Sequence, residues 1–184
     1  MMQRLQRISL IVLGLALGFG AHGYAVASAD AVTGLWRDDG SILWVQRVDD
    51  TLHAQLIALR PGETHYGEDE QTSWPIGSPR RDDNNPDPNQ QDRLLMGMQL
   101  LSDYQFTKGV WQGEIYDPGS GNTYSSTMKI SRKGDLQMRG YIGIALLGRT
   151  VTYQPFDPCL EHGLAVGEQF VAATVCSTAT SKAE

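Results

Sequence analysis

Apolar and polar positions alternate along most of the chain between Gly34 and Tyr153. This period of two is typical of half-buried β-strands, because successive side chains of a strand point to opposite faces. In residues 51–59 it places Leu52, Ala54 and Leu56 on one face. Gly, Asp and Pro interrupt the pattern at short intervals and favour chain reversals. The pattern therefore predicts an antiparallel meander.

Eight candidate strands follow from this spacing, at residues 34–36, 42–48, 51–59, 98–106, 111–116, 123–130, 136–142 and 149–153. Consecutive antiparallel strands with mostly short connections favour an up-and-down barrel, which leaves no sheet edge open. Gly140, Gly143 and Gly148 fall where a sheet must curl to close. We expect an all-β, eight-stranded antiparallel barrel at residues 30–155; a two-sheet sandwich is the alternative.

A long segment, residues 60–93, breaks the alternation with five prolines and many acids and amides. We expect a long loop, anchored by Trp74 and Ile76. Within it, D-D-N-N-P-D-P-N at 82–89 resembles the start of a calcium loop, although Pro88 stands where such a loop needs glycine. A capped Asx-Pro turn is the favoured interpretation, with structural roles for a set of residues in and after it: Asn85, Pro86, Asp87 and Arg93.

The two ends of the chain differ from the barrel segment. Residues 1–29 have arginines, an apolar run and two A-x-A sequences, as a cleaved signal peptide does, and we expect the cut after Ala29. An uncleaved anchor is the alternative. Export to the periplasm or medium would allow Cys159 and Cys176, in the tail at 156–184, to form a disulfide rather than remain free thiols.

Charge and motifs exclude several functions. The formal net charge of −6 becomes −8 once the two leader arginines are removed, so nucleic acid is a poor partner and membrane contact is peripheral at most. No G-x-S-x-G or H-E-x-x-H motif occurs. We expect no enzyme, cofactor or metal; paired carboxylates among Asp82, Asp83 and Asp87 are the weak alternative.

Four motifs resemble a bacterial family of exported proteins, the domain of unknown function 2147. They are N-N-P-D-P at 84–88, L-L-M-G at 94–97, W-Q-G-E-I-Y-D-P-G-S-G-N-T-Y at 111–124 and R-G-Y-I-G-I-A-L-L-G-R-T at 139–150. The resemblance implies a small lipocalin-like β-barrel with no established activity. The chain departs from the family pattern in keeping only Arg93 of a usual arginine pair, and in having Tyr153 where the family usually has Trp.

The function predicted from these features is a binding module for a small apolar or lipid-like ligand. An eight-stranded barrel is wide enough to hold one such ligand or to fill itself with side chains. The candidate ligand-binding residues are Trp44, Trp111, Tyr116, Met128, Met138 and Tyr141. A filled barrel that acts as an interaction or envelope-maintenance protein through the long loop is the alternative, and the sequence leaves the oligomeric state open.

A last expectation concerns closure of the barrel. Gly34-Leu35-Trp36 resembles the G-x-W that opens lipocalin barrels. We expect Trp36 to plug one end and the guanidinium of Arg149, from the last strand, to stack on its ring. The alternative is that Trp36 packs on aliphatic neighbours while Arg149 points to water.

Overall fold

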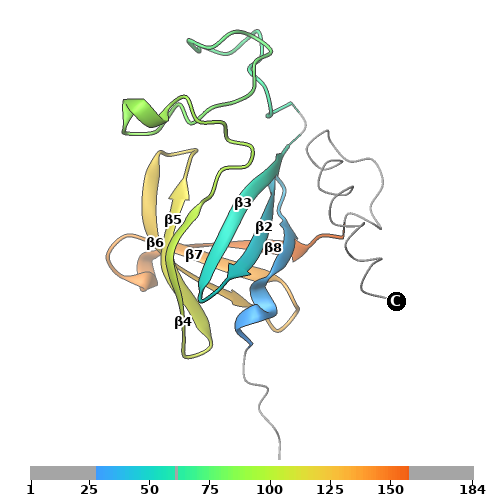
Figure 1. Cartoon of the computed structure of the whole chain (residues 1–184), viewed down its shortest axis with the longest axis vertical. Coiled ribbons are helices and arrows are strands. Elements are labelled where there is room, and N and C mark those ends of the chain that lie inside the picture. The colour runs from blue at the N-terminus through green and yellow to red at the C-terminus, as the bar shows by residue number, and fades with distance from the viewer. Residues whose placement is uncertain (1–27, 61, 158–184) are drawn as a thin grey trace, which may run out of the picture.

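The computed structural model describes residues 28–60 and 62–157 as one antiparallel sheet of eight strands in the order β3-β2-β1-β8-β7-β6-β5-β4 (Figure 1). Three 3₁₀ turns accompany the strands: η1 at Ala29–Val32 precedes β1, η2 at Pro88–Gln90 lies between β3 and β4, and η3 at Ala145–Leu147 lies between β7 and β8. The predicted all-β meander is confirmed. The strands are β1 Gly34–Arg37, β2 Ser41–Val48, β3 Thr51–Leu59, β4 Leu101–Thr107, β5 Val110–Asp117, β6 Asn122–Ile130, β7 Leu136–Tyr141 and β8 Arg149–Pro155.

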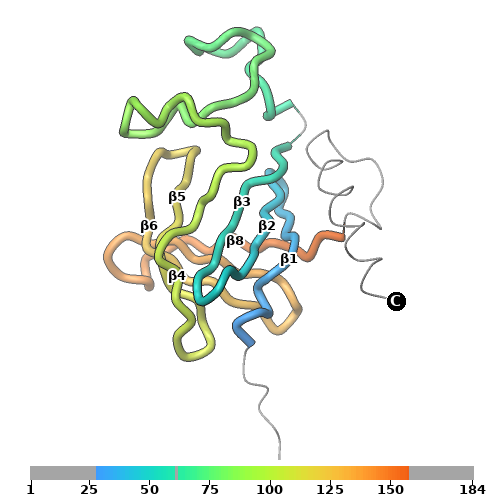
Figure 2. Tube along the Cα trace, in the orientation of Figure 1, coloured from blue at the N-terminus to red at the C-terminus, as the bar shows by residue number. Residues whose placement is uncertain are grey.

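Two contacts close the sheet into a barrel. The first and last strands pair, with Trp36 opposite Pro155. On the other side, Leu56 N donates to Met98 O at 3.0 Å and Leu100 N donates to Ala54 O at 2.9 Å, so β3 lies beside the segment that leads into β4 (Figure 2). The strand predicted at 98–106 therefore begins as a segment that bonds to β3. Leu100 O also accepts from Tyr116 N of β5 at 2.8 Å, and the regular β4–β5 pairing starts at Leu101.

The end of the barrel that carries η1 is filled. Val32 is only 2% exposed, and its carbonyl accepts a hydrogen bond from Trp36 Nε1 at 2.8 Å. The indole of Trp111 donates to Ala29 O at 2.9 Å. Tyr104 and Met128 are buried beside them and complete the core of this half. The two indole N–H groups thus satisfy carbonyls that the plug would otherwise bury unpaired.

The expected stacking of Arg149 on Trp36 is wrong. Arg149 is exposed and pairs with Gly140, at the opposite end of β8 from Pro155. Six residues of extended chain separate these two positions on β8, which is about 20 Å. β8 runs antiparallel to β1, so its first residue lies beyond the end of β1 rather than over Trp36. A guanidinium does meet an aromatic ring near Trp36, but it is Arg37 over Phe156, at 5.3 Å.

The leader and the tail fall largely outside the described residues. Cys159 and Cys176 both lie there, so their predicted pairing stays a prediction. Within residues 28–60 and 62–157, no helix is both long and apolar enough to cross a membrane.

Candidate ligand-binding cavity

A cavity of about 840 Å³ occupies the half of the barrel opposite η1 and opens to solvent. Its size falls within the range of small-molecule sites. Strands from both sides of the barrel and the β7–β8 loop contribute to its wall. Its lining residues come from six strands and include Leu43, Leu56, Ile115, Tyr124, Met138 and Tyr153.

Apolar side chains form the floor and walls of the cavity. Leu43, Leu56 and Leu100 are buried in the main core and also face the cavity. These three leucines form the boundary between the packed half of the barrel and the cavity. An apolar ligand that entered would replace water against these side chains, which is the main source of affinity for such ligands.

Polar groups gather toward the open end. Asp38, Asp117 and Arg149 line the cavity there together with Tyr153. Burial raises the pKa of the Tyr153 phenol, and the nearby Asp38 carboxylate raises it further. One oxygen of Asp38 already accepts from Ser41 N at 2.7 Å. This distribution suits a ligand with an apolar body and a polar end directed to the mouth.

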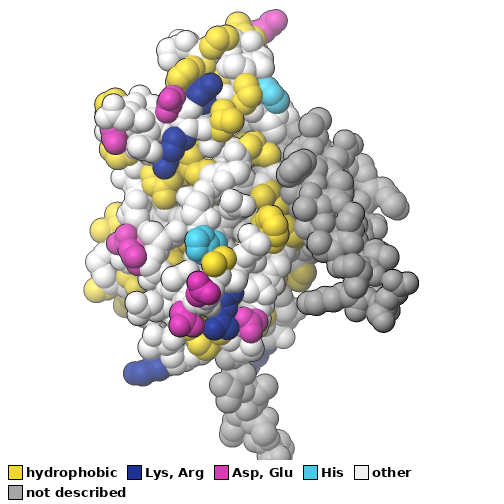
Figure 3. Space-filling view, viewed as in Figure 1, with side chains coloured by type: hydrophobic (Ala, Val, Ile, Leu, Met, Phe, Trp, Pro, Cys, Tyr) yellow, Lys and Arg dark blue, Asp and Glu magenta, His cyan; other side chains and the backbone are white. Residues whose placement is uncertain are grey.

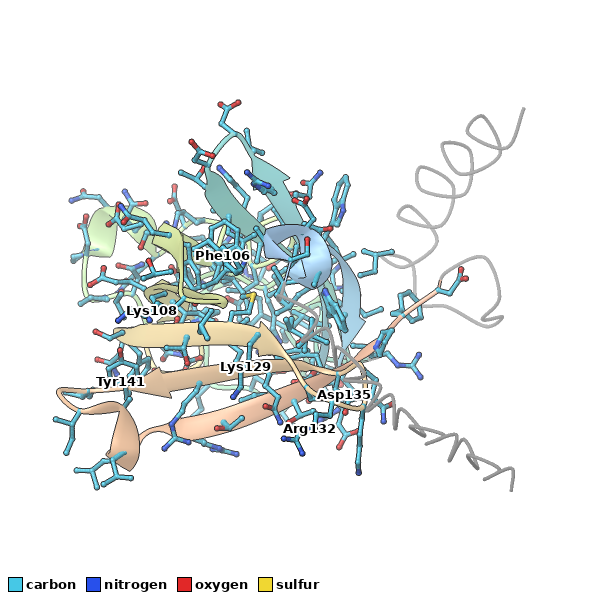
Figure 4. The ribbon with its side chains drawn as sticks, turned by 90° about the horizontal axis from the view of Figure 1, so that it is seen from below. Phe106, Lys108, Lys129, Arg132, Asp135 and Tyr141 are labelled. Carbon is cyan, nitrogen blue, oxygen red and sulfur yellow. The ribbon has the colours of Figure 1, made fainter. Side chains whose placement is uncertain are left out.

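The structure brings together three of the six predicted ligand-binding residues. Tyr116, Met138 and Tyr141 line the cavity. Tyr141 lies where β7 leads into the β7–β8 loop (Figure 4).

The other three predicted residues lie elsewhere. Trp111 and Met128 fill the η1 half of the barrel, and Trp44 packs against a separate small cluster with Leu35 and Phe156. Alternation gives the face of a strand but not the depth along the barrel, and a register shift between Ile42 and Leu43 changes the parity in β2.

The leucines of the wall were not among the predicted ligand residues. The alternation at 51–59 placed Leu56 on the apolar face of its strand. This alternation was the sequence signal that could have identified Leu56 as a residue of the cavity wall.

A buried carboxylate ties the long loop to the mouth of the barrel. Asp82 is fully buried, and its oxygens accept hydrogen bonds from Tyr116 OH at 2.7 Å, Asn85 Nδ2 at 2.7 Å and Arg93 Nη2 at 2.5 Å. Burial, followed by the bond to Asp82, raises the pKa of Tyr116 to about 12. Asn85 and Arg93, predicted as structural residues, meet at this carboxylate. Arg93, the one arginine that this chain keeps of the family's usual pair, therefore binds the buried carboxylate of the loop.

A second cluster organises the outer part of the loop, at the top of Figure 1. Asp83 accepts from Tyr66 OH at 2.6 Å and from Trp74 Nε1 at 2.5 Å. The guanidinium of Arg81 lies 4.4 Å from the centre of the Trp74 ring. Ile76 is 63% exposed, so its predicted anchoring role is wrong; the buried side chain here is Tyr66. This segment is therefore held together by polar contacts, which a hydrophobicity pattern does not reveal.

The N-N-P-D-P motif forms the predicted capped turn. Asn85 Oδ1 accepts from Asp87 N at 2.9 Å, and Asp87 Oδ1 accepts from Asn89 N at 3.0 Å as the N-cap of η2. Pro86 is exposed between them. The carboxylates considered as a catalytic pair accept hydrogen bonds from donors of the loop, and Asp82 also accepts one from Tyr116 of β5. The hydrogen bonds to Asn85 Oδ1 and Asp87 Oδ1 are those that the capped-turn interpretation of Asn85 and Asp87 expects.

Comparisons with known proteins agree with this architecture. Residues 34–154 match the model of a family described as an uncharacterized protein conserved in bacteria, DUF2147. Among solved structures, a chain described as protein HP1028 from the human pathogen Helicobacter pylori, which belongs to the lipocalin family, is similar with a TM-score of 0.55 and 18% identity. The match covers 76% of this chain and 96% of that one. No curated protein matches significantly.

Proposed function

Because the chain belongs to the DUF2147 family of bacterial proteins and has a lipocalin-like barrel, we propose that it is an exported binding module for a small apolar ligand. The ligand lies in the open half of the barrel, and its polar end faces the rim. The leader at residues 1–29 supports export to the periplasm or medium.

The observation that carries this proposal is the division of the barrel into a packed half and a hollow half. A barrel with a purely structural role can fill its interior along its whole length, as Trp111, Tyr104 and Met128 do near η1. Beyond them the leucines face an open volume of about 840 Å³. Maintaining apolar walls around such a volume forgoes packing contacts, which is a cost that ligand binding can offset.

The alternative, an interaction protein that acts through the long loop, has less support. It needs an accessible apolar patch around Trp74. The Trp74 ring is half-buried, with Arg81 against its face and its N–H bonded to Asp83. The ring face and the N–H group of Trp74, which a protein partner would contact, are therefore already occupied by Arg81 and Asp83.

The test is a titration of the protein with the neutral fluorescent probe N-phenyl-1-naphthylamine. We expect saturable enhancement of its fluorescence, because the probe enters an apolar site. In Ile115→Trp the larger ring occupies the cavity, and we expect probe affinity to fall at least about tenfold.

The matched control places the same indole on the outside of the same strand. Gln112 is exposed on β5, so Gln112→Trp should bind the probe as the wild type does. Equal probe binding by Ile115→Trp, in a variant that retains its thermal transition, would contradict a site in the barrel.

A further inference from the structure

An exposed apolar loop stands beside the mouth of the cavity. Between β7 and β8, four large aliphatic side chains are 59–83% exposed. They are Ile142, Ile144, Leu146 and Leu147. This concentration of exposed aliphatic side chains in one short turn exceeds the scattered single residues that a soluble surface normally shows. The loop projects away from the barrel at the left of Figure 1, and hydrophobic side chains follow the left edge of the surface in Figure 3.

The loop is held in this shape by one arginine. Arg139 Nε donates to Ala145 O at 2.7 Å, its Nη2 donates to Leu146 O at 3.0 Å, and its Nη1 donates to Thr150 Oγ1 at 2.9 Å. These bonds satisfy carbonyls of the η3 turn from the barrel side. The hydrogen bonds from Arg139 therefore fix the turn in a conformation that keeps the aliphatic side chains exposed.

The four side chains divide into two pairs. Ile142 and Leu147 line the cavity, whereas Ile144 and Leu146 do not. The loop thus carries apolar side chains both at the cavity wall and on its exposed part. A ligand that left an apolar phase at the tip of the loop would meet apolar side chains until it entered the barrel.

We propose that this loop docks the cavity mouth on the surface of a lipid bilayer, from which the ligand is collected or to which it is delivered. This inference rests on the proposed function. A small convex turn suits insertion at the boundary of headgroups and acyl chains, where buried apolar area drives binding. A stable interface with a second protein needs about 800 Å² and 20–30 residues from each partner, far more than one turn presents.

The local charge also fits a lipid surface. The chain as a whole carries a formal charge of −6, but residues 136–156 contain no Asp or Glu and two arginines, Arg139 and Arg149. Anionic lipid headgroups are attracted to exposed basic side chains near the surface. Asp38 and Asp117 also line the cavity, but they do not belong to the loop.

The experiment measures co-sedimentation of the purified mature protein with vesicles of phosphatidylcholine, alone and mixed with phosphatidylglycerol. We expect binding to both, and stronger binding to the mixture. The double substitution Ile144→Asp with Leu146→Asp should lower partitioning at least about tenfold, because two inserted aliphatic side chains are lost. Val48→Asp is the control, since Val48 is 48% exposed at the end of β2, near the packed end of the barrel.

The outcomes separate this inference from the function on which it rests. Ile144 and Leu146 do not line the cavity, so the double variant should bind N-phenyl-1-naphthylamine in solution as the wild type does. Failure of the wild type to bind vesicles, or equal binding by the double variant, would overturn the docking role. A wild-type dimer that the double substitution converts to a monomer would also overturn it. Vesicle binding by a protein that takes up no probe would instead overturn the proposed function and leave docking in place.

Discussion

Asp82 shows how one side chain can hold a long loop. Its carboxylate is 0% exposed and has donors on both oxygens, from the loop itself and from β5. A buried charge of this kind adds little net stability over an apolar pair, but removing one partner is costly because the remaining charge stays buried. Loss of the Arg93, Asn85 or Tyr116 side chain would therefore leave the buried Asp82 carboxylate without one of its donors.

The first prediction is that Arg93→Ala lowers the free energy of unfolding by about 2–3 kcal/mol, because the guanidinium is the only cation bonded to Asp82 among the described residues. Partial solvent access of Arg93 places the effect below the upper range for such pairs. Arg132→Ala, on the exposed β6–β7 turn, should change stability by less than about 0.5 kcal/mol. Urea denaturation measures both, and equal effects would contradict the role of the pair.

The buried tyrosines predict a dependence of stability on alkaline pH. Burial raises the pKa of Tyr104 to about 12, whereas an unfolded tyrosine titrates near 10. The unfolded chain then loses its proton first, so the free energy of unfolding falls by about 1.4 kcal/mol per pH unit for this residue between roughly pH 10 and 12. The stabilisation is complete below pH 10. Tyr104→Phe should reduce the slope in this window; an unchanged slope in urea titrations would refute the assignment.

The contacts of Ser28 and Ala29 favour the earlier of the two A-x-A sequences as the cleavage site. Ser28 Oγ accepts from Asp30 N at 3.2 Å, and Ala29 O accepts the Trp111 indole at 2.9 Å. A cut after Ala29 would remove both groups from the plug. We therefore predict that the exported protein begins at Ser28, after the A-x-A sequence that ends at Ala27. N-terminal sequencing that returned Asp30 would contradict a role for these residues, and Met1 would contradict cleavage.

At the scale of elements, the long loop and the β5–β6 hairpin are packed against each other through their turns. Asn84 Nδ2 donates to the carbonyls of Pro118 and Gly119, each at 3.1 Å. Gly121 has a φ of +69°, and a Cβ there would lie 1.8 Å from Asn84 O. Two of the sequence motifs, N-N-P-D-P and D-P-G-S-G, thus form one contact. Each motif was visible in the sequence, but their meeting was not, because it joins residues more than 30 positions apart.

Gly121→Ala should therefore separate the loop from the hairpin. The left-handed backbone alone costs about 1–2 kcal/mol for a residue with a Cβ, and the clash with Asn84 adds to it. Gly134→Ala is the matched control, since Gly134 has a φ of +91° and open space around it. We expect Gly121→Ala to be destabilised by at least about 2 kcal/mol more, with faster proteolysis within residues 62–93. Similar losses in the two variants would show that the turn contact is dispensable.

For the whole molecule, the order of the strands could be predicted because each depends on local alternation and local turns. The closure through residues 98–100 could not, since Gln99 bridges to Gln55 only when the distant strand is already in place. The depth of each side chain in the barrel was equally hidden, and so Trp111 and Met128 were assigned to the cavity although they fill the other half. The same limitation led to the wrong partner for Trp36. The period of two in a sequence predicts the face of the strand to which each side chain points. It does not predict how far one strand is shifted along its neighbours.

An apolar ligand in the open half of the barrel is the main feature of the proposed function. Native mass spectrometry of protein purified from its own cell envelope, without detergent, tests this most directly. We expect a fraction of the protein to retain a noncovalent small apolar mass, which is displaced by N-phenyl-1-naphthylamine and absent from Ile115→Trp. Protein that carries no such mass and takes up no probe would contradict the account.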